Sequence, residues 1–273
     1  MKSLNSYITE GGFFKNIKAE IVTPKSKEEL IDIINDTMAK EGLNCDLNFI
    51  NTSKITDMST LFQSTKLFKF NGDISNWDVS KVRNMSYMFA NSAFDGDISK
   101  WNVANVTNMS RMFEGGLFNG DISKWNISNV LSMRGMFRNC VFNKDISKWN
   151  VSKVKDMAFM FSGSTFNGDI SNWDVSKVMD MAGMFMRSQF NGDISKWNVS
   201  KVADMSYMFS DSTFNGDISN WDVSKVTDMT MMFLNSNFEG DISKWNVSKV
   251  RYWSHMFDDS KLKKLDKLPD WYK

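Results

Sequence analysis

The sequence predicts an α/β repeat solenoid, and its periodicity is the main reason. Eight tryptophans recur at a constant spacing of 24 residues: Trp77, Trp101, Trp125, Trp149, Trp173, Trp197, Trp221 and Trp245. Around each of them one string returns, of the form Phe-Asn-Gly-Asp-Ile-Ser-Lys-Trp-Asn-Val-Ser-Lys-Val-x-Asp-Met-x-x-Met-Phe. A period of about 20 to 50 residues is typical of stacked coils that bury their apolar faces against one another. We therefore expect function on a long repeated surface rather than in a pocket.

Residues 1–45 precede the repeats and are expected to form a tail and a small α/β cap. Alternating apolar residues predict a strand over residues 15–22, which Pro24 ends. The string Ser26-Lys27-Glu28-Glu29 has the form of a capping box and predicts an amphipathic helix that stops at Gly42. In the alternative interpretation, the first dozen residues are a tail that docks the protein to a partner.

Residues 46–261 are expected to form the solenoid, with one degenerate repeat followed by eight full repeats of 24 residues. In the degenerate repeat, residues 46–50 match Asp-Ile-Ser-Asn-Trp, and Ile50 takes the tryptophan position. Terminal repeats are commonly atypical because one of their faces meets solvent or a cap. Residues 262–273 are expected to close the C-terminal end.

The apolar residues within one repeat predict the shape of a coil. Ile74, Trp77 and Val79 follow the Leu-x-x-Leu-x-Leu spacing that places a short parallel strand in a leucine-rich repeat. The apolar residues from Val82 to Phe89 follow a helical spacing, so a short helix or 3₁₀ turn is expected there. Each coil is therefore predicted to be leucine-rich-repeat-like, with one strand and one short helix.

Charge and composition disfavour several classes of protein. Thirty-three Lys and Arg balance 32 Asp and Glu, which does not indicate a protein that coats nucleic acid. The single histidine, His255, has no nucleophile motif beside it, so we expect no enzyme and no cofactor. Cys45 and Cys140 lie far apart and are interpreted as reduced, buried fillers.

The sequence shows no apolar run of 18 residues, so no membrane insertion is expected. Residues 1–10 lack the apolar stretch and cleavage site of a secretory signal. These features favour a cytoplasmic protein or a part of a virion or other assembly, with surface display only by a non-classical route.

The repeat string resembles that of the BspA-like leucine-rich surface-protein family, which includes mycoplasma lipoproteins with repeats of unknown function. The resemblance covers residues 46 to about 261, and residues 214–233 carry it most clearly through Trp-Asp-Val and Asp-Met-x-x-Met-Phe. It implies a leucine-rich-type solenoid used for protein binding or adhesion, and it brings no catalytic residue.

Two columns of repeated side chains allow a structural and a functional interpretation. The tryptophans and methionines are expected to form internal ladders, with a carbohydrate-binding platform as the alternative. The aspartate of each Gly-Asp or Lys-Asp pair is expected to cap a turn, with calcium as the alternative. The aspartate column consists of Asp73, Asp97, Asp121, Asp145, Asp169, Asp193, Asp217 and Asp241.

The residues that flank each tryptophan are expected on the concave face of the array. Asn-Trp-Asp and Lys-Trp-Asn are the two variants, which would let neighbouring coils form ion pairs, and Lys100, Lys124 and Lys148 would form an unbroken basic column. This column is one candidate binding site, for a repetitive anionic partner. Variation lies elsewhere, on a convex edge that includes Arg111, Phe159 and Met186. We favour this variable edge as the site that a single protein partner meets, because it offers non-identical contacts.

The leading functional hypothesis is a non-enzymatic protein-protein interaction or adhesion module. Its partner would be another protein or a repetitive surface ligand, and not nucleic acid. The alternative is a structural or virion-associated spacer that docks through its N-terminal segment. Carbohydrate adhesion through the tryptophan and asparagine columns is a third possibility.

Overall fold

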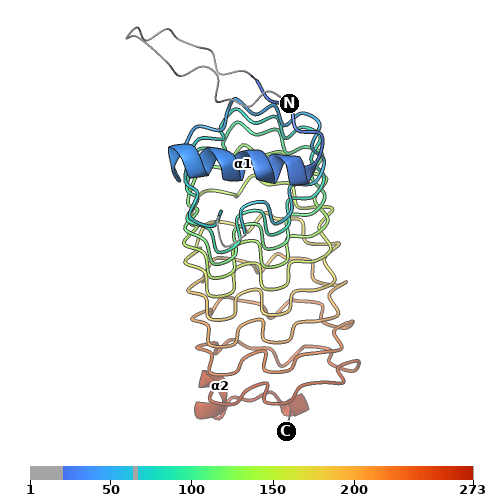
Figure 1. Ribbon diagram of the computed structural model, residues 1–273. Helices are drawn as coiled ribbons and strands as arrows, with labels where there is room; N and C mark the ends of the chain where they lie inside the picture. The colour runs from blue at the N-terminus through green and yellow to red at the C-terminus, as the bar shows by residue number, and fades with distance from the viewer. Residues whose placement is uncertain (1–20, 64–66, 273) are drawn as a thin grey trace, which may run out of the picture.

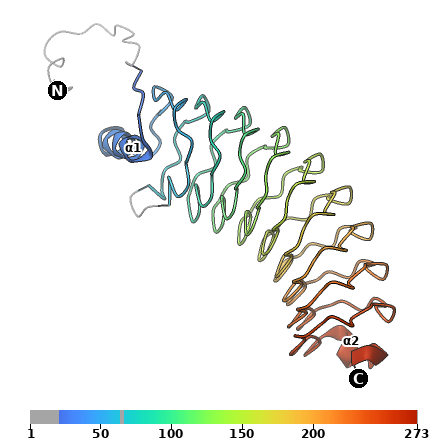
Figure 2. The same cartoon turned by 90° about the vertical axis from the view of Figure 1, so that its right-hand side faces the viewer.

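The computed structural model describes residues 21–63 and 67–272 and consists of coils stacked one upon the next (Figures 1 and 2). Helix α1, Lys27–Glu41, lies at the N-terminal end of the stack. The short helix α2, Lys261–Lys264, and the 3₁₀ helix η2, Asp270–Tyr272, lie at the C-terminal end. We name each coil after its tryptophan, so the Trp77 coil comprises residues 70–93.

Three tripeptides with a buried middle residue shape a full coil, and their common form is Asx-apolar-Ser, with Ala, Thr or Arg in place of Ser in some coils. In the Trp77 coil they are Asp73-Ile74-Ser75, Asp78-Val79-Ser80 and Asn84-Met85-Ser86. The side-chain Oδ1 of the first residue accepts the N–H of the third at 2.9 to 3.1 Å, which is the geometry of an Asx turn. The middle residue is buried in all three. These turns therefore point the apolar residues inward without a helix.

The last part of each coil forms what we call the turn ribbon, residues 83–92 of the Trp77 coil and their equivalents at steps of 24. A parallel bridge joins Asn84 to Asn108, and the same bridge repeats along the array to Tyr252. Beyond it, the N–H groups of Met85 and Phe89 donate to carbonyls of the next coil, each at 2.9 Å. Backbone hydrogen bonds therefore fasten neighbouring coils along this segment.

This arrangement corrects the strand and helix predicted for each coil. Among the described residues, the helices are α1, α2 and η2, and the segment from Val82 to Phe89 forms tight turns. Tyr87 has φ of 58° and Asn91 has φ of 55°, and an α-helix cannot continue through a left-handed residue. The parallel bridge lies at Asn84 rather than between Ile74 and Val79. In the described residues, helices therefore lie only at the ends of the stack, and the parallel bridges are isolated rather than parts of strands.

The opposite side of each coil is held by side chains. The indole Nε1 of Trp101 donates to the carbonyl of Ile74 in the preceding coil, and all eight repeats make this bond at 3.0 to 3.2 Å. Asn119 Oδ1 accepts the N–H of Asn143 at 3.0 Å in a second column of this kind. The tryptophans are only 3 to 4% exposed, which confirms that they belong to the core.

The stack bends (Figure 2), and the spacing of the rings places the turn ribbon on its inner side. Rings of the Phe89 column are 5.2 to 6.0 Å apart. Rings of the Phe70 column are 6.1 to 6.4 Å apart. Coils are closest where backbone hydrogen bonds join them. The expectation that the residues flanking tryptophan lie on the concave face is therefore wrong, because the hydrogen-bonded ladder runs through the other segment.

At the N-terminal end, α1 begins after Ser26, whose Oγ accepts the N–H of Glu29 at 3.2 Å. It ends at Gly42, as expected, with φ of 91°. Leu30 and Ile34 of this helix are fully buried. Of the predicted strand, only the end is described, where Val22 forms a parallel bridge with Ile50. The rest of that strand and the docking tail lie outside the described residues.

The C-terminal segment contains part of a further coil that the sequence pattern does not reveal. Trp271 Nε1 donates to the carbonyl of Ile242 at 3.1 Å, the bond that each repeat tryptophan makes. Leu-Pro-Asp-Trp thus stands in for Ile-Ser-Lys-Trp, but at a spacing of 26 residues. Lys267 and Pro269 occupy the Asp and Ser positions of the first Asx turn, and proline has no N–H to cap.

Candidate interaction surface

Sequence variation between coils gathers on the turn ribbon, and so do two residue types common at protein interfaces. All six arginines of the chain lie there: Arg83, Arg111, Arg134, Arg138, Arg187 and Arg251. Three of the five tyrosines also lie there: Tyr87, Tyr207 and Tyr252. Basic residues elsewhere in the repeats are lysines. Arginine and tyrosine are enriched among hot-spot residues, whose replacement by alanine weakens binding most. Lysine is depleted from the cores of interfaces.

One position of the ribbon combines bulky side chains with an unfavourable backbone. Its non-glycine members have φ between 54° and 59°: Thr60, Tyr87, Arg111, Phe159, Tyr207, Met231 and His255. Gly135 and Gly183 have φ of 60° and 57° at the same position, so the coil accepts glycine there. For most L-residues this left-handed conformation costs about 1 to 2 kcal/mol. Strain of this kind clusters at functional sites.

The side chain of Phe159 packs between residues of the two neighbouring coils. The guanidinium carbons of Arg134 and Arg138 lie 5.3 and 5.5 Å from its ring centroid, within cation–π range. On the other side is Gly183, where a Cβ atom would overlap the ring. The ring is therefore pre-ordered and half-buried at the centre of the ribbon.

Ion pairs extend this cluster toward both ends of the array. The Glu114 carboxylate forms ion pairs with Arg138 Nη1 at 3.3 Å and with Arg111 Nη1 at 3.6 Å. Arg134 pairs with Asp180 at 3.0 Å. The Arg111 guanidinium also lies 5.4 Å from the ring centroid of Tyr87. These contacts join coils from Trp77 to Trp173 into one network, which we call the arginine–aromatic cluster.

Exposed apolar side chains border the arginine–aromatic cluster. Leu117 and Val141 follow the ribbon in successive coils and are 57% and 43% exposed. Leu131, at the first ribbon position of the Trp125 coil, is 42% exposed. A partner that covered the cluster would also remove these side chains from water, which is favourable at about 25 cal/mol per Å².

The structure separates the six residues predicted as binding residues. Arg111 and Phe159 belong to the arginine–aromatic cluster, and Met186 lies on the same ribbon in the Trp173 coil, half-buried. Lys100, Lys124 and Lys148 lie on the other side, exposed, each three residues after an aspartate of the turn column. Arg134, Arg138 and Glu114 were not predicted. The confinement of arginine to the variable segment is the signal in the sequence that identifies them.

The alternation of Asp and Asn after tryptophan has a structural explanation. Oδ1 of Asp174 accepts the N–H of Ser176 at 3.1 Å, and Oδ1 of Asn150 accepts the N–H of Ser152 at the same distance. Either side chain can form this Asx turn. None of the ion pairs found among the described residues joins these flanking positions of neighbouring coils. Both variants thus form the same turn.

The aspartate column caps turns as expected. Each member accepts the N–H of the serine two residues later at 2.9 Å. Hydrogen bonds from Ser123 hold the pKa of Asp121 below its ordinary value, and Ser171 does the same for Asp169. In the described ranges, no three His, Cys, Asp or Glu side chains are grouped closely enough to hold a metal ion.

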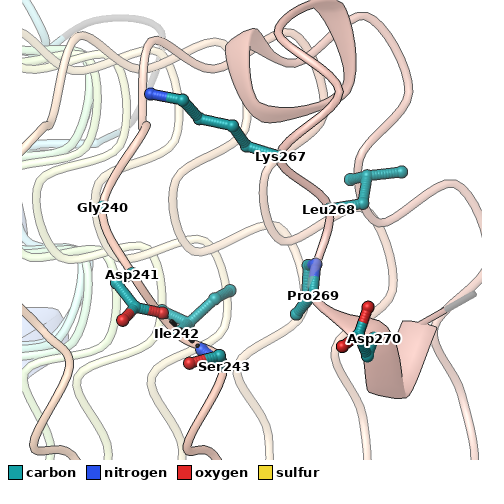
Figure 3. Close-up of a pocket in the computed structure, with 8 residues that line it drawn as sticks. All are labelled: Gly240, Asp241, Ile242, Ser243, Lys267, Leu268, Pro269 and Asp270. Atoms are coloured by element: carbon teal, nitrogen blue, oxygen red, sulfur yellow. Dashed lines mark hydrogen bonds between the residues drawn. The ribbon is translucent and has the colours of Figure 1, made fainter.

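Two clefts lie on the described surface. One, of about 160 Å³, lies between Gly240–Ser243 and Lys267–Asp270 (Figure 3) and is below the roughly 300 to 1,000 Å³ of typical ligand pockets. The other, of about 450 Å³, is open to solvent and is lined by Asn44, Asn71–Asp73, Ser75 and Gly96–Asp97. Burial raises the pKa of the Cys140 thiol to about 11, which keeps it protonated and unreactive at neutral pH. None of the helices in the described part of the chain has the length and apolar character needed to cross a membrane.

Comparison with known proteins identifies one family. Its model, described as Mycoplasma protein of unknown function, DUF285, matches residues 33–141, 116–213 and 164–271. The overlapping matches span nearly all of the array. No curated protein and no solved structure matches the chain. The mycoplasma part of the resemblance is therefore confirmed, and the wider BspA-like assignment stays a prediction.

Proposed function

Because the chain belongs to this family of mycoplasma repeat proteins, whose function is unknown, we propose a function from the surface of its own coils. The protein is a non-enzymatic interaction or adhesion module, and the turn ribbon binds another protein. The arginine–aromatic cluster is the centre of the binding surface. The BspA-like resemblance, which implies adhesion, agrees with this proposal.

One observation carries the proposal. At the ribbon position of Tyr87, Arg111 and Phe159, bulky residues adopt a left-handed backbone conformation, whereas the coils on either side of Phe159 have glycine there. For folding, the backbone strain at Tyr87, Arg111 and Phe159 offsets much of what their side-chain contacts contribute. A binding surface gains rigid aromatic and arginine side chains, which lose little conformational entropy when a partner arrives. Their conformation is therefore best explained by recognition.

The chemistry of the surface favours a protein over other partners. Guanidinium groups half-covered by rings and bordered by leucine and valine suit a mixed apolar and acidic protein surface. Binding to nucleic acid would favour a continuous basic field, whereas Glu114, Asp156 and Asp180 lie among the arginines. No catalytic role and no cofactor form part of the proposal.

The test compares two variants of the full chain in affinity capture from the native host. In the ribbon variant, Arg111→Ser and Arg138→Ser are combined with Phe159→Gly. In the matched control, Lys100, Lys124 and Lys148 are replaced with Asn on the convex side. Captured proteins are quantified by mass spectrometry, and cross-linking maps the contact on this chain.

We expect the ribbon variant to capture at least about tenfold less of its partner than the parent chain, because truncation of hot-spot residues weakens binding to this extent. The control variant should capture as much as the parent. Loss of the partner with the lysine variant alone would move the binding face to the convex side. Retention of every partner by both variants would instead favour a spacer that docks through residues outside the described structure.

A further inference from the structure

The turn ribbon is polar along the axis of the stack. In the Trp77 coil, the N–H groups of Met85, Tyr87, Phe89 and Asn91 donate to carbonyls of the next coil, whereas the N–H of Arg83 donates to the preceding one, and later coils repeat this pattern. The last such step joins Met229 to the carbonyl of Tyr252 at 2.7 Å and Met231 to that of Ser254 at 3.0 Å. An ordinary strand edge alternates donors and acceptors. The C-terminal edge of this array instead presents the N–H groups of Trp253 and His255 in succession, with the carbonyl of Arg251 as an acceptor beside them.

At that edge the ladder stops within the described residues. In the Trp245 coil, the N–H groups of Trp253 and His255 correspond to those of Met229 and Met231, yet no acceptor meets them in the described part of the chain. The segment that follows turns away and covers the other half of the end, where Trp271 bonds to Ile242. Residues 251–255 are all left exposed.

The side chains at this edge also depart from the repeat. Tyr252 and Trp253 replace the Asp and Met that most other coils carry, and they are 61% and 39% exposed. The change removes the Asx turn that would cap the N–H of Ser254. Unpaired backbone donors beside aromatic side chains can bind an extended peptide. Carbonyls of the peptide would accept the N–H groups, and an apolar side chain of the peptide would pack on the rings.

We propose that this C-terminal edge is a second interaction surface, which binds an extended polypeptide segment of another protein. Carbonyl oxygens of that segment accept the N–H groups of Trp253 and His255 and continue the ladder by one row. Its apolar side chains pack on Tyr252 and Trp253. This surface is separate from the arginine–aromatic cluster.

A second copy of the chain does not fit this edge. The complementary carbonyl row lies at the first coil, and α1 covers that end. Lys27 Nζ donates to Ser59 Oγ at 2.9 Å, and Leu30 and Ile34 are buried against the coil. Stacking of copies would have to displace α1, so a second copy is not the occupant of this edge.

The test uses a synthetic peptide of residues 226–237 as the probe, because it carries the carbonyl row of an ordinary ribbon. Amide hydrogen exchange is measured on the intact chain with and without the peptide at about 1 mM, a concentration suited to weak binding. We expect the amides of Trp253 and His255 to exchange about tenfold more slowly with peptide present. The amides of Met229 and Met231 are already bonded and should not change.

The matched variant restores the repeat through Tyr252→Asp together with Trp253→Met. It should fold at least as well, because the Asx turn returns, and it should bind the peptide about tenfold more weakly. No added protection in the parent chain, or equal binding by the variant, would overturn the proposal. End-to-end association of the intact chain in sedimentation would also overturn it, since the occupant would then be a second copy.

Discussion

Phe159 tests whether the left-handed ribbon residues serve the fold. Its φ is 58°, the conformation that Gly183 adopts in the next coil. Phe159→Gly should relieve about 1 to 2 kcal/mol of backbone strain. The greater freedom of glycine in the unfolded chain should lower the free energy of unfolding by about 0.5 to 1 kcal/mol. Each lost cation–π contact should lower it by a similar amount. We therefore expect chemical denaturation to show a free energy of unfolding within about 1 kcal/mol of the parent. A loss above about 2 kcal/mol would mean that the ring is structural.

Trp125 represents the opposite kind of residue. It is 4% exposed and donates to the carbonyl of Ile98 at 3.1 Å. Trp125→Ala should destabilise by about 3 to 5 kcal/mol, because it leaves a cavity and an unpaired carbonyl. Trp125→Phe fills most of the space and should cost about 1 to 3 kcal/mol, mainly for the carbonyl. Equal losses in the two variants would show that the hydrogen bond contributes little.

The sequence predicted the buried residues well and the conformation of ribbon residues poorly. The 24-residue period places Trp125 and its equivalents at one phase, and only burial explains a large apolar residue there in every coil. Nothing in the residue type of Phe159 or Arg111 indicates a left-handed backbone, because that conformation is unfavourable for both. It is imposed by the hydrogen bonds to neighbouring coils.

A single coil shows why the strand and helix were predicted wrongly. The spacing of Ile74, Trp77 and Val79 indicates which side chains point inward. It does not indicate the conformation of the backbone between them. Successive tight turns produce the same inward set: Trp77 N–H bonds to the Ile74 carbonyl at 3.1 Å and Val82 N–H to that of Val79 at 2.9 Å. The Asx-apolar-Ser tripeptides were visible in the sequence and predict such turns.

The aspartate column makes the stability of the coils dependent on pH. Hydrogen bonds from serine lower the pKa of its members in the folded state, so the folded protein binds fewer protons than the unfolded chain near pH 4. This stabilisation is fully present above the unfolded pKa of about 3.9 and is lost as pH falls through the lower folded value. We expect thermal unfolding to show a Tm that is nearly constant from about pH 7 to 5 and falls below about pH 4.

Asparagine in four of these positions provides the control. The variant carries Asn in place of Asp121, Asp169, Asp193 and Asp217. Each asparagine keeps an Oδ1 acceptor for the serine N–H but does not titrate. The variant should unfold near the parent Tm at pH 7 and lose less of it below about pH 4. An unchanged slope of Tm against pH would show that other carboxylates govern acid unfolding.

The curvature of the array arises only when all coils are stacked. Ring separations of 5.2 to 6.0 Å on the ribbon side and 6.1 to 6.4 Å in the Phe70 column differ little, yet the difference accumulates over the coils. No single repeat contains this information, so the concave face could not be assigned from the sequence. The variable residues were recognised correctly, but they line the inner side of the bend.

The two ends differ, and α1 should protect the N-terminal one. Leu30 and Ile34 are fully buried there, whereas Asp32 and Asp36 on the same helix are exposed. Replacing Leu30 and Ile34 with Asp would bury two unpaired charges, so α1 should detach at a cost of several kcal/mol. Leu47 and Leu61 of the first coil would then meet water. We expect amide protection to be lost first in residues 46–62 and sedimentation to show association that rises with concentration. Asp32→Ser with Asp36→Ser should leave both unchanged. A monomer with full protection after the Leu30 and Ile34 changes would mean that the coils need no cap at this end.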